Sequence, residues 1–299
     1  YVSDCRGSSP PSTHKVCVNT QGAHKQSIEV LLTGLDIEKK AEIYIDQIFH
    51  NLGGKEQFTD VDIHLIRSDK EDPATNEEAH AALRITVTSD DHSKFGRLFQ
   101  AKITELGLAT IPGNTGRGAA GYNGNPVIAY WPTLIDSRKV TERVHINGDL
   151  IEVLPTQRLG LEELYYQEVP IKVPPAPSGD TIRIPFGRLF GTRSGDKGGA
   201  ANCGVWARTD EAFSFLYEFL TAEMFKELAP DMASYKIERF ELPNLRALNF
   251  YIHDVLGEGV SSNHRIDKQA KSLCEYLRAK TIDAPKLLID QIARANVNE

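Results

Sequence analysis

The chain has 299 residues, of which 40% are hydrophobic and 25% are charged, and this composition predicts a globular protein with enough apolar residues for two domains. Its formal net charge of −7 argues against nucleic-acid binding and against a broad anionic-membrane surface, because both need a basic face. No apolar run in the sequence approaches the roughly 18 residues that a membrane-spanning helix requires.

The cysteines and histidines show no metal-binding or disulfide pattern. The four cysteines are scattered and include no Cys-x-x-Cys pair, so we predict free thiols in a reducing compartment and a cytoplasmic location. None of the nine histidines falls in a His-x-x-x-His spacing, so we predict no metal site and identify no cofactor. The cysteines are Cys5, Cys17, Cys203 and Cys274.

The first half of the chain predicts alternating strands and helices. Short β-branched runs at 15–20 and 28–33 suit two strands joined through Gly22. A helix over 37–52 has its apolar residues on one face and is ended by Gly53-Gly54. Further strands are expected at 61–66, 81–88 and 127–131, and a second helix at 93–106. The resulting order of strand, helix, strand, strand, helix, strand is a split βαβ unit, which packs its helices on one side of a sheet.

A glycine-rich stretch at 111–124 lies between the second helix and the last of these strands. Its five glycines surround a single cation, Arg117, and we predict a ligand loop in which Arg117 binds an anion. A mobile surface loop without a ligand is an equally open alternative.

The middle of the chain predicts a hairpin and then a linker. Residues 140–157 suit one or two strands, with Asn147-Gly148-Asp149 as the hairpin turn. The proline-rich segment 169–180 predicts a stiff, extended linker. We therefore expect a first domain over 1–168 and a second over 181–299.

The second half also predicts helices packed on a sheet. A helix is expected over 210–228, strands over 235–241 and 247–255, and a further helix from an Asp267 cap to about residue 280. Alternation along 247–255 puts Asn249, Tyr251 and His253 on one face of their strand. We expect this polar face to be the open face of the sheet.

The most unusual stretch of the sequence is 191–202, which combines four glycines with Arg193, Asp196 and Lys197. Glycines at these positions allow backbone N–H groups to approach an anion, and the two cations suit a phosphate or a carboxylate. The spacing is not that of a nucleotide P-loop, because Lys197 is followed by two glycines. The alternative is a tight hairpin with solvated Asp196 and Lys197 side chains.

We predict a polar site built from this stretch and from the strand that follows residue 241. Asp196 and Lys197 are the candidate catalytic residues. The alternative is a polar network that only fixes the conformation of a hairpin. The candidate substrate-binding residues are Arg193, Ser194, Gly195, Gly198, Gly199, Asn202, Asn244, Arg246, Asn249 and Arg117.

The runs Arg-Ser-Gly-Asp-Lys-Gly-Gly at 193–199 and Glu-Leu-Pro-Asn-Leu-Arg-Ala-Leu-Asn-Phe at 241–250 resemble the C-terminal domain of the acyclic terpene utilisation family. The resemblance implies an α+β protein with a ferredoxin-like C-terminal domain. Residues 34–47 and 73–88 resemble the rear part of the larger α/β domain of that family. Because the chain starts at Tyr1 and matches only about the back half of a typical member, we expect a longer N-terminal part to precede it.

The resemblance also implies a pathway for branched-chain or terpenoid acids, whose intermediates commonly travel as coenzyme A thioesters. We expect an enzyme of hydratase or lyase type that acts on a small carboxylic acid or its acyl-CoA. Lys197 and Arg193 would bind the anion, Asp196 would serve as acid or base, and the asparagines would orient the substrate. The alternative is a non-catalytic assembly module in which the glycine-rich stretch stabilises a subunit interface. In either case we expect a homo-oligomer, because such sheets leave an edge or a face to cover.

Overall fold

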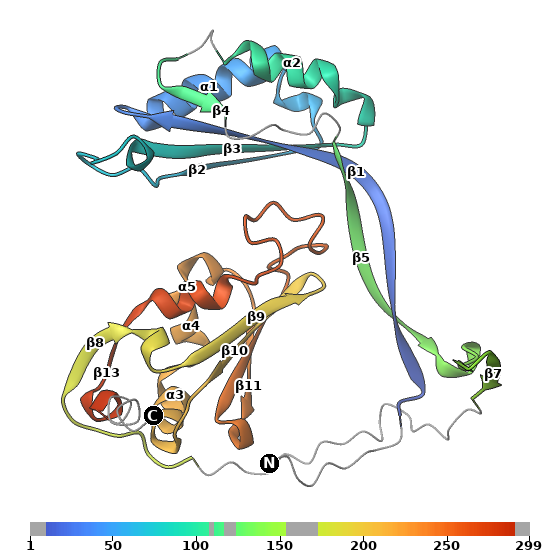
Figure 1. Cartoon of the computed structure of the whole chain (residues 1–299), viewed down its shortest axis with the longest axis vertical. Helices are drawn as coiled ribbons and strands as arrows, with labels where there is room; N and C mark the ends of the chain where they lie inside the picture. Colours follow the sequence, from blue (N-terminus) through green and yellow to red (C-terminus); the bar gives the residue numbers. More distant parts are fainter. Residues whose placement is uncertain (1–9, 108–110, 117–123, 154–172, 291–299) are drawn as a thin grey trace. The chain divides into compact units, whose positions relative to one another are not determined.

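The computed structural model describes residues 10–107, 111–116, 124–153 and 173–290 (Figure 1). The chain divides into two compact units, each with its own hydrophobic core. Unit 1 comprises residues 1–19, 130–260 and 267–299, and unit 2 comprises residues 20–129 and 261–266. The predicted α+β class with two sheet-and-helix parts is confirmed, whereas the linker expected at 169–180 lies partly outside the described residues and stays a prediction.

Unit 2 has the predicted split βαβ arrangement. Its strands lie in the order β2-β3-β1-β4, with β5 also paired to β1, and the β2–β3, β1–β3 and β1–β4 pairs are antiparallel. The division between the units falls within β1 and β5, so both strands continue into unit 1. The elements are β1 (Thr13–Thr33), α1 (Ile37–Asn51), β2 (Asp60–Ile66), β3 (His80–Ser89), α2 (Arg97–Glu105), β4 (Asn114–Gly116) and β5 (Asn125–Asp136).

Helices α1 and α2 cover one face of the unit 2 sheet (Figure 1). Helix α1 ends as predicted, because Gly53 and Gly54 adopt φ angles of 86° and 109° that other residues disfavour. The helix buries Tyr44, and this burial raises the pKa of its hydroxyl to about 12. The core is completed by alternate residues of β1 and β3, such as Leu32 and Ile85. The opposite face of this sheet is therefore left to polar side chains.

Two elements of unit 2 differ from the predictions. Strand β1 is one continuous strand rather than two joined at Gly22, since Gly22 is extended within it and makes no turn. Helix α2 begins at Arg97 rather than at residue 93. The Asp91 carboxylate accepts a hydrogen bond from the Ser93 amide at 2.9 Å and starts a short 3-10 turn, and Gly96, with φ of 106°, then separates that turn from the helix.

Unit 1 contains a four-stranded antiparallel sheet in the order β11-β12-β10-β9 and a separate β8–β13 pair. Its helices share one core with the buried face of the four-stranded sheet, so the other face of that sheet carries no helix from the described residues of this unit. The elements are β8 (Thr181–Pro185), β9 (Gly191–Lys197), β10 (Ala200–Trp206), α3 (Asp210–Phe219), α4 (Ala222–Leu228), β11 (Ile237–Leu242), β12 (Ala247–Ile252), α5 (Leu273–Ala279) and β13 (Thr281–Pro285).

The helix predicted over 210–228 is two helices. Leu220 leaves the helical region, and the Thr221 hydroxyl accepts a hydrogen bond from the Met224 amide at 3.0 Å, which starts α4. The last helix starts later than predicted, because the Asp267 carboxylate caps the turn before it and Ala270, with φ of 51°, interrupts the helical path.

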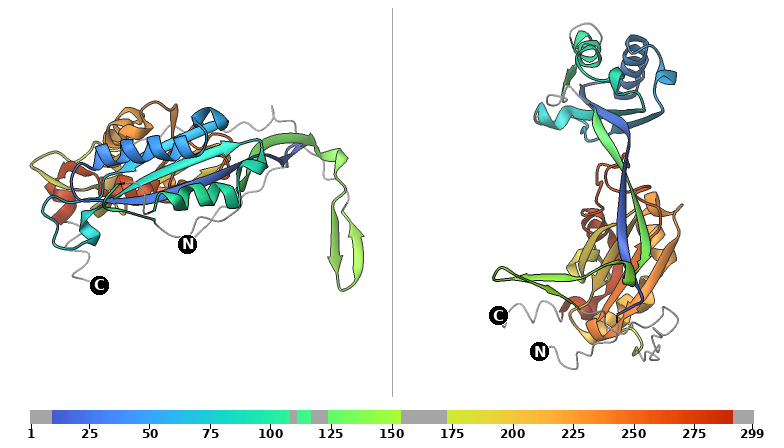
Figure 2. Two further views of the ribbon diagram at one scale, coloured as in Figure 1. Left: turned by 90° about the horizontal axis from the view of Figure 1, so that it is seen from above. Right: turned by 90° about the vertical axis from the view of Figure 1, so that its right-hand side faces the viewer.

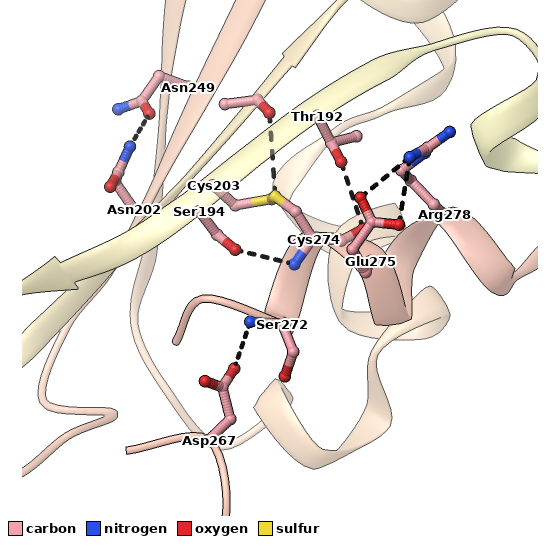
Figure 3. The surroundings of a disulfide bond; sticks show 11 residues. Thr192, Ser194, Asn202, Cys203, Asn249, Asp267, Ser272, Cys274, Glu275 and Arg278 are labelled. Atoms are coloured by element: carbon pink, nitrogen blue, oxygen red, sulfur yellow. Dashed lines mark hydrogen bonds and ion pairs between the residues drawn. A yellow bond between two sulfur atoms is a disulfide. The ribbon is translucent and has the colours of Figure 1, made fainter. Parts of the chain in front are cut away.

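The prediction of free thiols was wrong for Cys203 and Cys274, which form a disulfide in the core of unit 1 (Figure 3). Cys203 lies on the helix-covered face of β10, and Cys274 lies in the first turn of α5 with its Cα 6.1 Å from that of Cys203. The pair is separated by 71 residues, so no local spacing could reveal it. Cys17 is free and exposed, and Cys5 lies outside the described residues.

The hairpin predicted around residue 148 is confirmed as β6 (Arg143–Ile146) and β7 (Asp149–Glu152) (Figure 2). Asn147 and Gly148 both have positive φ, at 52° and 92°, as a type I′ turn requires. Every residue of the two strands is exposed. None of the helices in the described part of the chain combines the length and apolar character needed to cross a membrane.

Candidate functional site

The glycine-rich stretch 191–202 forms a hairpin between two sheet strands rather than a long open loop. Lys197 pairs with Ala200, so Gly198 and Gly199 alone make the turn, and Gly198 has φ of 68°. A Cβ atom on Gly199 would lie 1.9 Å from the Gly257 carbonyl oxygen, and one on Gly198 would lie 2.7 Å from the Tyr130 ring. Close packing within unit 1 therefore explains both glycines without a ligand.

Alternation along β9 separates the predicted charged residues. Asp196 pairs with Ala201, which is fully buried on the helix-covered face, and the Asp196 side chain therefore points away from the open face. Arg193 and Lys197 lie on the open face, on either side of Gly195. The two cations share this face but lie four residues apart, about 13 Å along the strand, and the Asp196 carboxylate points away from it.

Ser194 has a structural partner. Its side chain is on the helix-covered face, where its hydroxyl accepts a hydrogen bond from the Cys274 amide at 3.0 Å (Figure 3). That amide is one of the first N–H groups of α5, which have no partner within the helix. Ser194 thus caps α5 from a neighbouring strand.

Asn202 and Asn249 are brought together as predicted. The Asn202 carboxamide donates a hydrogen bond to the Asn249 carboxamide oxygen at 3.1 Å, and the two side chains point toward each other from β10 and β12 (Figure 3). Both lie on the open face, since their strand neighbours Cys203 and Phe250 are buried in the core.

The structure does not bring Asn244 and Arg246 to the same place. They precede Ala247, which pairs with Trp206, whereas Asp196 pairs with Ala201. Five strand residues separate these two levels of the sheet, a distance of about 17 Å. Asn244 is exposed, and the Arg246 guanidinium binds the Asp210 carboxylate at 2.5 Å. The remaining predicted residue, Arg117, lies outside the described residues.

Strand register shows how the open face of unit 1 is composed. One end of the face carries polar side chains, and the other carries large apolar side chains with exposed fractions of 41% for Trp206, 50% for Phe240 and 41% for Leu242. The paired rows across β11, β12, β10 and β9 are Glu238, Tyr251, Asn202 and Gly195; then Phe240, Asn249, Gly204 and Arg193; then Leu242, Ala247, Trp206 and Gly191.

The predicted alternation is confirmed within β12, which ends at Ile252 rather than at residue 255. It brings His253, which the sequence had suggested for the polar cluster, next to Glu238, which the sequence had not suggested. The His253 Nε2 atom lies 2.7 Å from a Glu238 carboxylate oxygen, and the His253 ring stands edge-on to Tyr251 with centroids 4.8 Å apart. A hydrogen bond from Lys236 and a second from His253 hold the pKa of the Glu238 carboxyl below its usual value.

Two parts of the open face could have been found from the sequence. Period-two alternation within 237–242 places Glu238, Phe240 and Leu242 on one face, and the same rule within 191–197 separates Asp196 from Lys197. The order of the strands in the sheet, which brings these residues together, is not contained in such local patterns.

Comparisons with known proteins agree along most of the chain. The family model described as acyclic terpene utilisation family protein AtuA matches residues 1–146, and the model described as AtuA ferredoxin-like domain matches residues 184–283. Neither a curated protein nor a solved structure gives a significant match.

Proposed function

Because the chain belongs to the acyclic terpene utilisation family, we propose that it is an enzyme that acts on a small branched-chain or terpenoid carboxylic acid or on its acyl-CoA thioester. The reaction that we propose is a hydration or a carbon–carbon cleavage. The open face of the ferredoxin-like sheet is the proposed binding surface.

The observation that carries this proposal is the division of that face into an anion-binding end and an apolar end. The Arg193 guanidinium makes no hydrogen bond or ion pair with any described residue, and the space above neighbouring Gly195 is empty within 4 Å. Lys197 and His253 lie four residues along β9 and β12 from Arg193 and Asn249, which is about 13 Å. A branched acyl-CoA thioester would span this length, with a phosphate of the coenzyme by Arg193, an apolar part of the coenzyme against Trp206 and Phe240, and the acyl group by Lys197 and His253.

Acid–base chemistry on this face is assigned to His253. The Glu238 carboxylate orients the imidazole, as carboxylates commonly do for catalytic histidines. In a hydration, His253 would accept a proton from water as the water oxygen attacks the β-carbon. The electron pair of the double bond would move toward the thioester carbonyl, and the α-carbon would then take up a proton. Lys197 would stabilise the negative charge that develops on the carbonyl oxygen.

Whether Asp196 is catalytic is tested with a variant. Its strand position favours a structural role, and Asp196→Asn separates the two possibilities because it keeps the shape of the side chain. A loss of turnover without a loss of thermal stability would assign catalysis to Asp196 after all.

The proposal is tested by turnover and binding of branched acyl-CoA thioesters, beginning with 3-methylbut-2-enoyl-CoA. We expect Arg193→Gln to weaken binding about tenfold or more, as the loss of a charge-assisted hydrogen bond would. Arg183→Gln is the matched control, because Arg183 is an exposed arginine on β8 of the same unit. His253→Gln should lower turnover far more than binding.

Native mass measured on the same variants tests the assembly role. If Arg193→Gln and Lys197→Ala dissociate an oligomer and leave thioester binding unchanged, the face is an interface rather than a substrate site. If no branched acid or thioester binds the unaltered protein, the proposed function is wrong.

A further inference from the structure

A second polar surface covers the face of the unit 2 sheet that α1 and α2 leave open. Residues whose side chains share this face are polar at every position over three successive levels of β2, β3 and β1. The paired rows are Asp60, Thr88 and Lys25; then Asp62, Thr86 and Ser27; then His64, Arg84 and Glu29. A sheet face of this composition is unusual beneath other protein segments, since polar groups lose hydration there.

The segment Ser261–Ile266, here called the strap, is part of the same compact unit and lies against this face. The Lys25 ammonium donates a hydrogen bond to the Asn263 carbonyl oxygen at 2.9 Å, and the Arg84 guanidinium donates one to the His264 carbonyl oxygen at 2.8 Å. The His264 ring returns the contact, with Nε2 at 2.9 Å from the Asp60 carboxylate.

The strap and its neighbours bury charged groups. Lys25 is only 6% exposed, Thr88 is 9% exposed, and the Arg84 side chain is 11% exposed. Exposure rises toward β2, where the Asp60 side chain is 58% exposed. The β2 side is therefore the more exposed edge of this buried network.

Several buried polar atoms on this face have no hydrogen-bond partner among the described residues. They belong to β2, β3 and the strap, and a lost partner destabilises a buried polar group unless a ligand or water replaces it. The other oxygen of the Asp62 carboxylate lies 3.0 Å from the His64 ring, whereas Oδ2 has only a long ion-pair contact of 3.9 Å with Arg84 Nη2. The unpaired atoms are Asp62 Oδ2, Arg84 Nε, Thr88 Oγ1 and His264 Nδ1.

The chemistry of these atoms defines what could satisfy them. Arg84 Nε can only donate, and an ionised Asp62 oxygen can only accept, whereas Thr88 and His264 can do either. A single ligand that meets both demands has an anionic oxygen and a hydroxyl group. We propose that this face binds a small hydroxycarboxylic acid, with its carboxylate on Arg84 and its hydroxyl on Asp62.

The strap responds to such a ligand. Arg84 Nη2 and Lys25 Nζ already donate to strap carbonyls, whereas Arg84 Nε and His264 Nδ1 are left for the ligand. A ligand on these two atoms therefore bridges β3 and the strap, and amide hydrogen exchange of Ser261–Ile266 slows as the ligand concentration rises. This site goes beyond the proposed function, because none of its residues belongs to the open face of unit 1.

Calorimetric titration of the whole chain with 3-hydroxy-3-methylbutanoate and with 3-methylbutanoate tests the proposal, since these acids differ only in the hydroxyl. We expect the hydroxy acid to bind at least tenfold more tightly. Arg84→Gln should weaken binding of the hydroxy acid by a similar factor. Asp62→Ala should reduce its affinity to that of 3-methylbutanoate. Arg67→Gln is the matched control, because Arg67 is an exposed arginine of the same unit.

Thr88→Val separates ligand binding from a purely structural network. The substitution keeps the side-chain shape and removes a buried hydroxyl that has no partner, so the ligand-free protein should be as stable as before or more stable. Its affinity for the hydroxy acid should nevertheless fall.

Equal affinity for the two acids, or no binding at millimolar concentrations, would overturn the proposal and leave the network as an anchor for the strap. The thioester measurements on Arg193→Gln are independent of this outcome, so the two proposals can fail separately. If Arg84→Gln does not fold, Asp62→Ala and Thr88→Val still decide the question.

Discussion

The sheets of the two units arrange three corresponding strands in the same spatial order. The strand that pairs with the other side of β1 or β10 comes from a different point of the chain in each unit. In unit 2 the order β2-β3-β1 is completed by β4 and β5, which follow the second helix. In unit 1 the order β11-β12-β10 is completed by β9, which precedes β10 and joins it through a two-residue turn. A sequence motif that resembles a ligand loop is, in this position, an edge strand with a tight hairpin.

The open faces of the two sheets differ in burial. The unit 1 face exposes Arg193 and Phe240, whereas the unit 2 face holds Lys25 at 6% exposure beneath the strap. Exposed charges are screened by water and salt, but buried charges interact strongly and destabilise the fold when a partner is lost. The unit 1 face therefore tolerates substitution more readily than the unit 2 face.

The largest expected effect tests whether the hydrophobic cores of the two units unfold independently of each other. Phe250 in unit 1 and Ile85 in unit 2 are both fully buried, so Phe250→Ala should cost about 3–5 kcal/mol and Ile85→Ala about 2–5 kcal/mol. Hydrogen exchange should show lost protection mainly in the unit that carries the substitution. Equal loss in both units would mean that the cores unfold as one.

The disulfide is a second difference, because it lies within unit 1. Replacing both Cys203 and Cys274 by alanine should lower the free energy of unfolding by about 2–4 kcal/mol, since the bond closes a long loop in the unfolded chain. Denaturant unfolding with and without a reductant measures this. Cys17→Ser is the control, because Cys17 is free and exposed, and its effect should be small.

Two glycines of the β9–β10 hairpin test whether close packing explains the glycines of its turn. Gly199→Ala should cost roughly 1–3 kcal/mol, because the new Cβ would collide with the Gly257 backbone. Gly195→Ala should be neutral or gain up to about 1 kcal/mol, because its Cβ would meet nothing within 4 Å and alanine restricts the unfolded chain. Thermal unfolding compares the two, and equal effects would contradict this explanation of the turn.

The smallest expected effect concerns pH on the open face of unit 1. The pKa of Glu238 is lowered by Lys236 and then by His253, so these contacts stabilise the fold above the usual value of 4.5. The stabilisation is lost as the pH falls through the lowered pKa. Glu238→Gln should remove this part of the acid dependence of the melting temperature. An unchanged acid dependence in the variant would show that the ion pair contributes nothing measurable.

Local patterns predicted the elements better than their boundaries. The apolar face of α1 and its Gly53-Gly54 end follow directly from helical spacing, and the polar face of β12 follows from period-two alternation. The division between α3 and α4 depends on one threonine cap, Thr221, which a continuous apolar pattern conceals. The disulfide depends on β10 lying beneath α5, which no spacing of cysteines reveals.

The candidate sites show the same limit. Alternation could have separated Ser194 and Asp196 from Arg193, because neighbouring residues of a strand face opposite ways. The polar face of the unit 2 sheet could also have been predicted from the alternation of polar and apolar residues along β2 and β3. The contribution of His264 could not be predicted, because its contact with Asp60 spans 204 residues of sequence.

Because of the strap, unit 2 cannot be completed on the ribosome until most of unit 1 has been synthesised. Domains usually fold as they emerge, beginning at the N-terminal side. Residues 20–129 of unit 2 emerge early, but its last piece is Ser261–Ile266, which follows nearly all of the unit 1 sheet and helices. During most of translation, the buried lysine and arginine of the nascent unit 2 face therefore remain open to solvent and to any anion in reach.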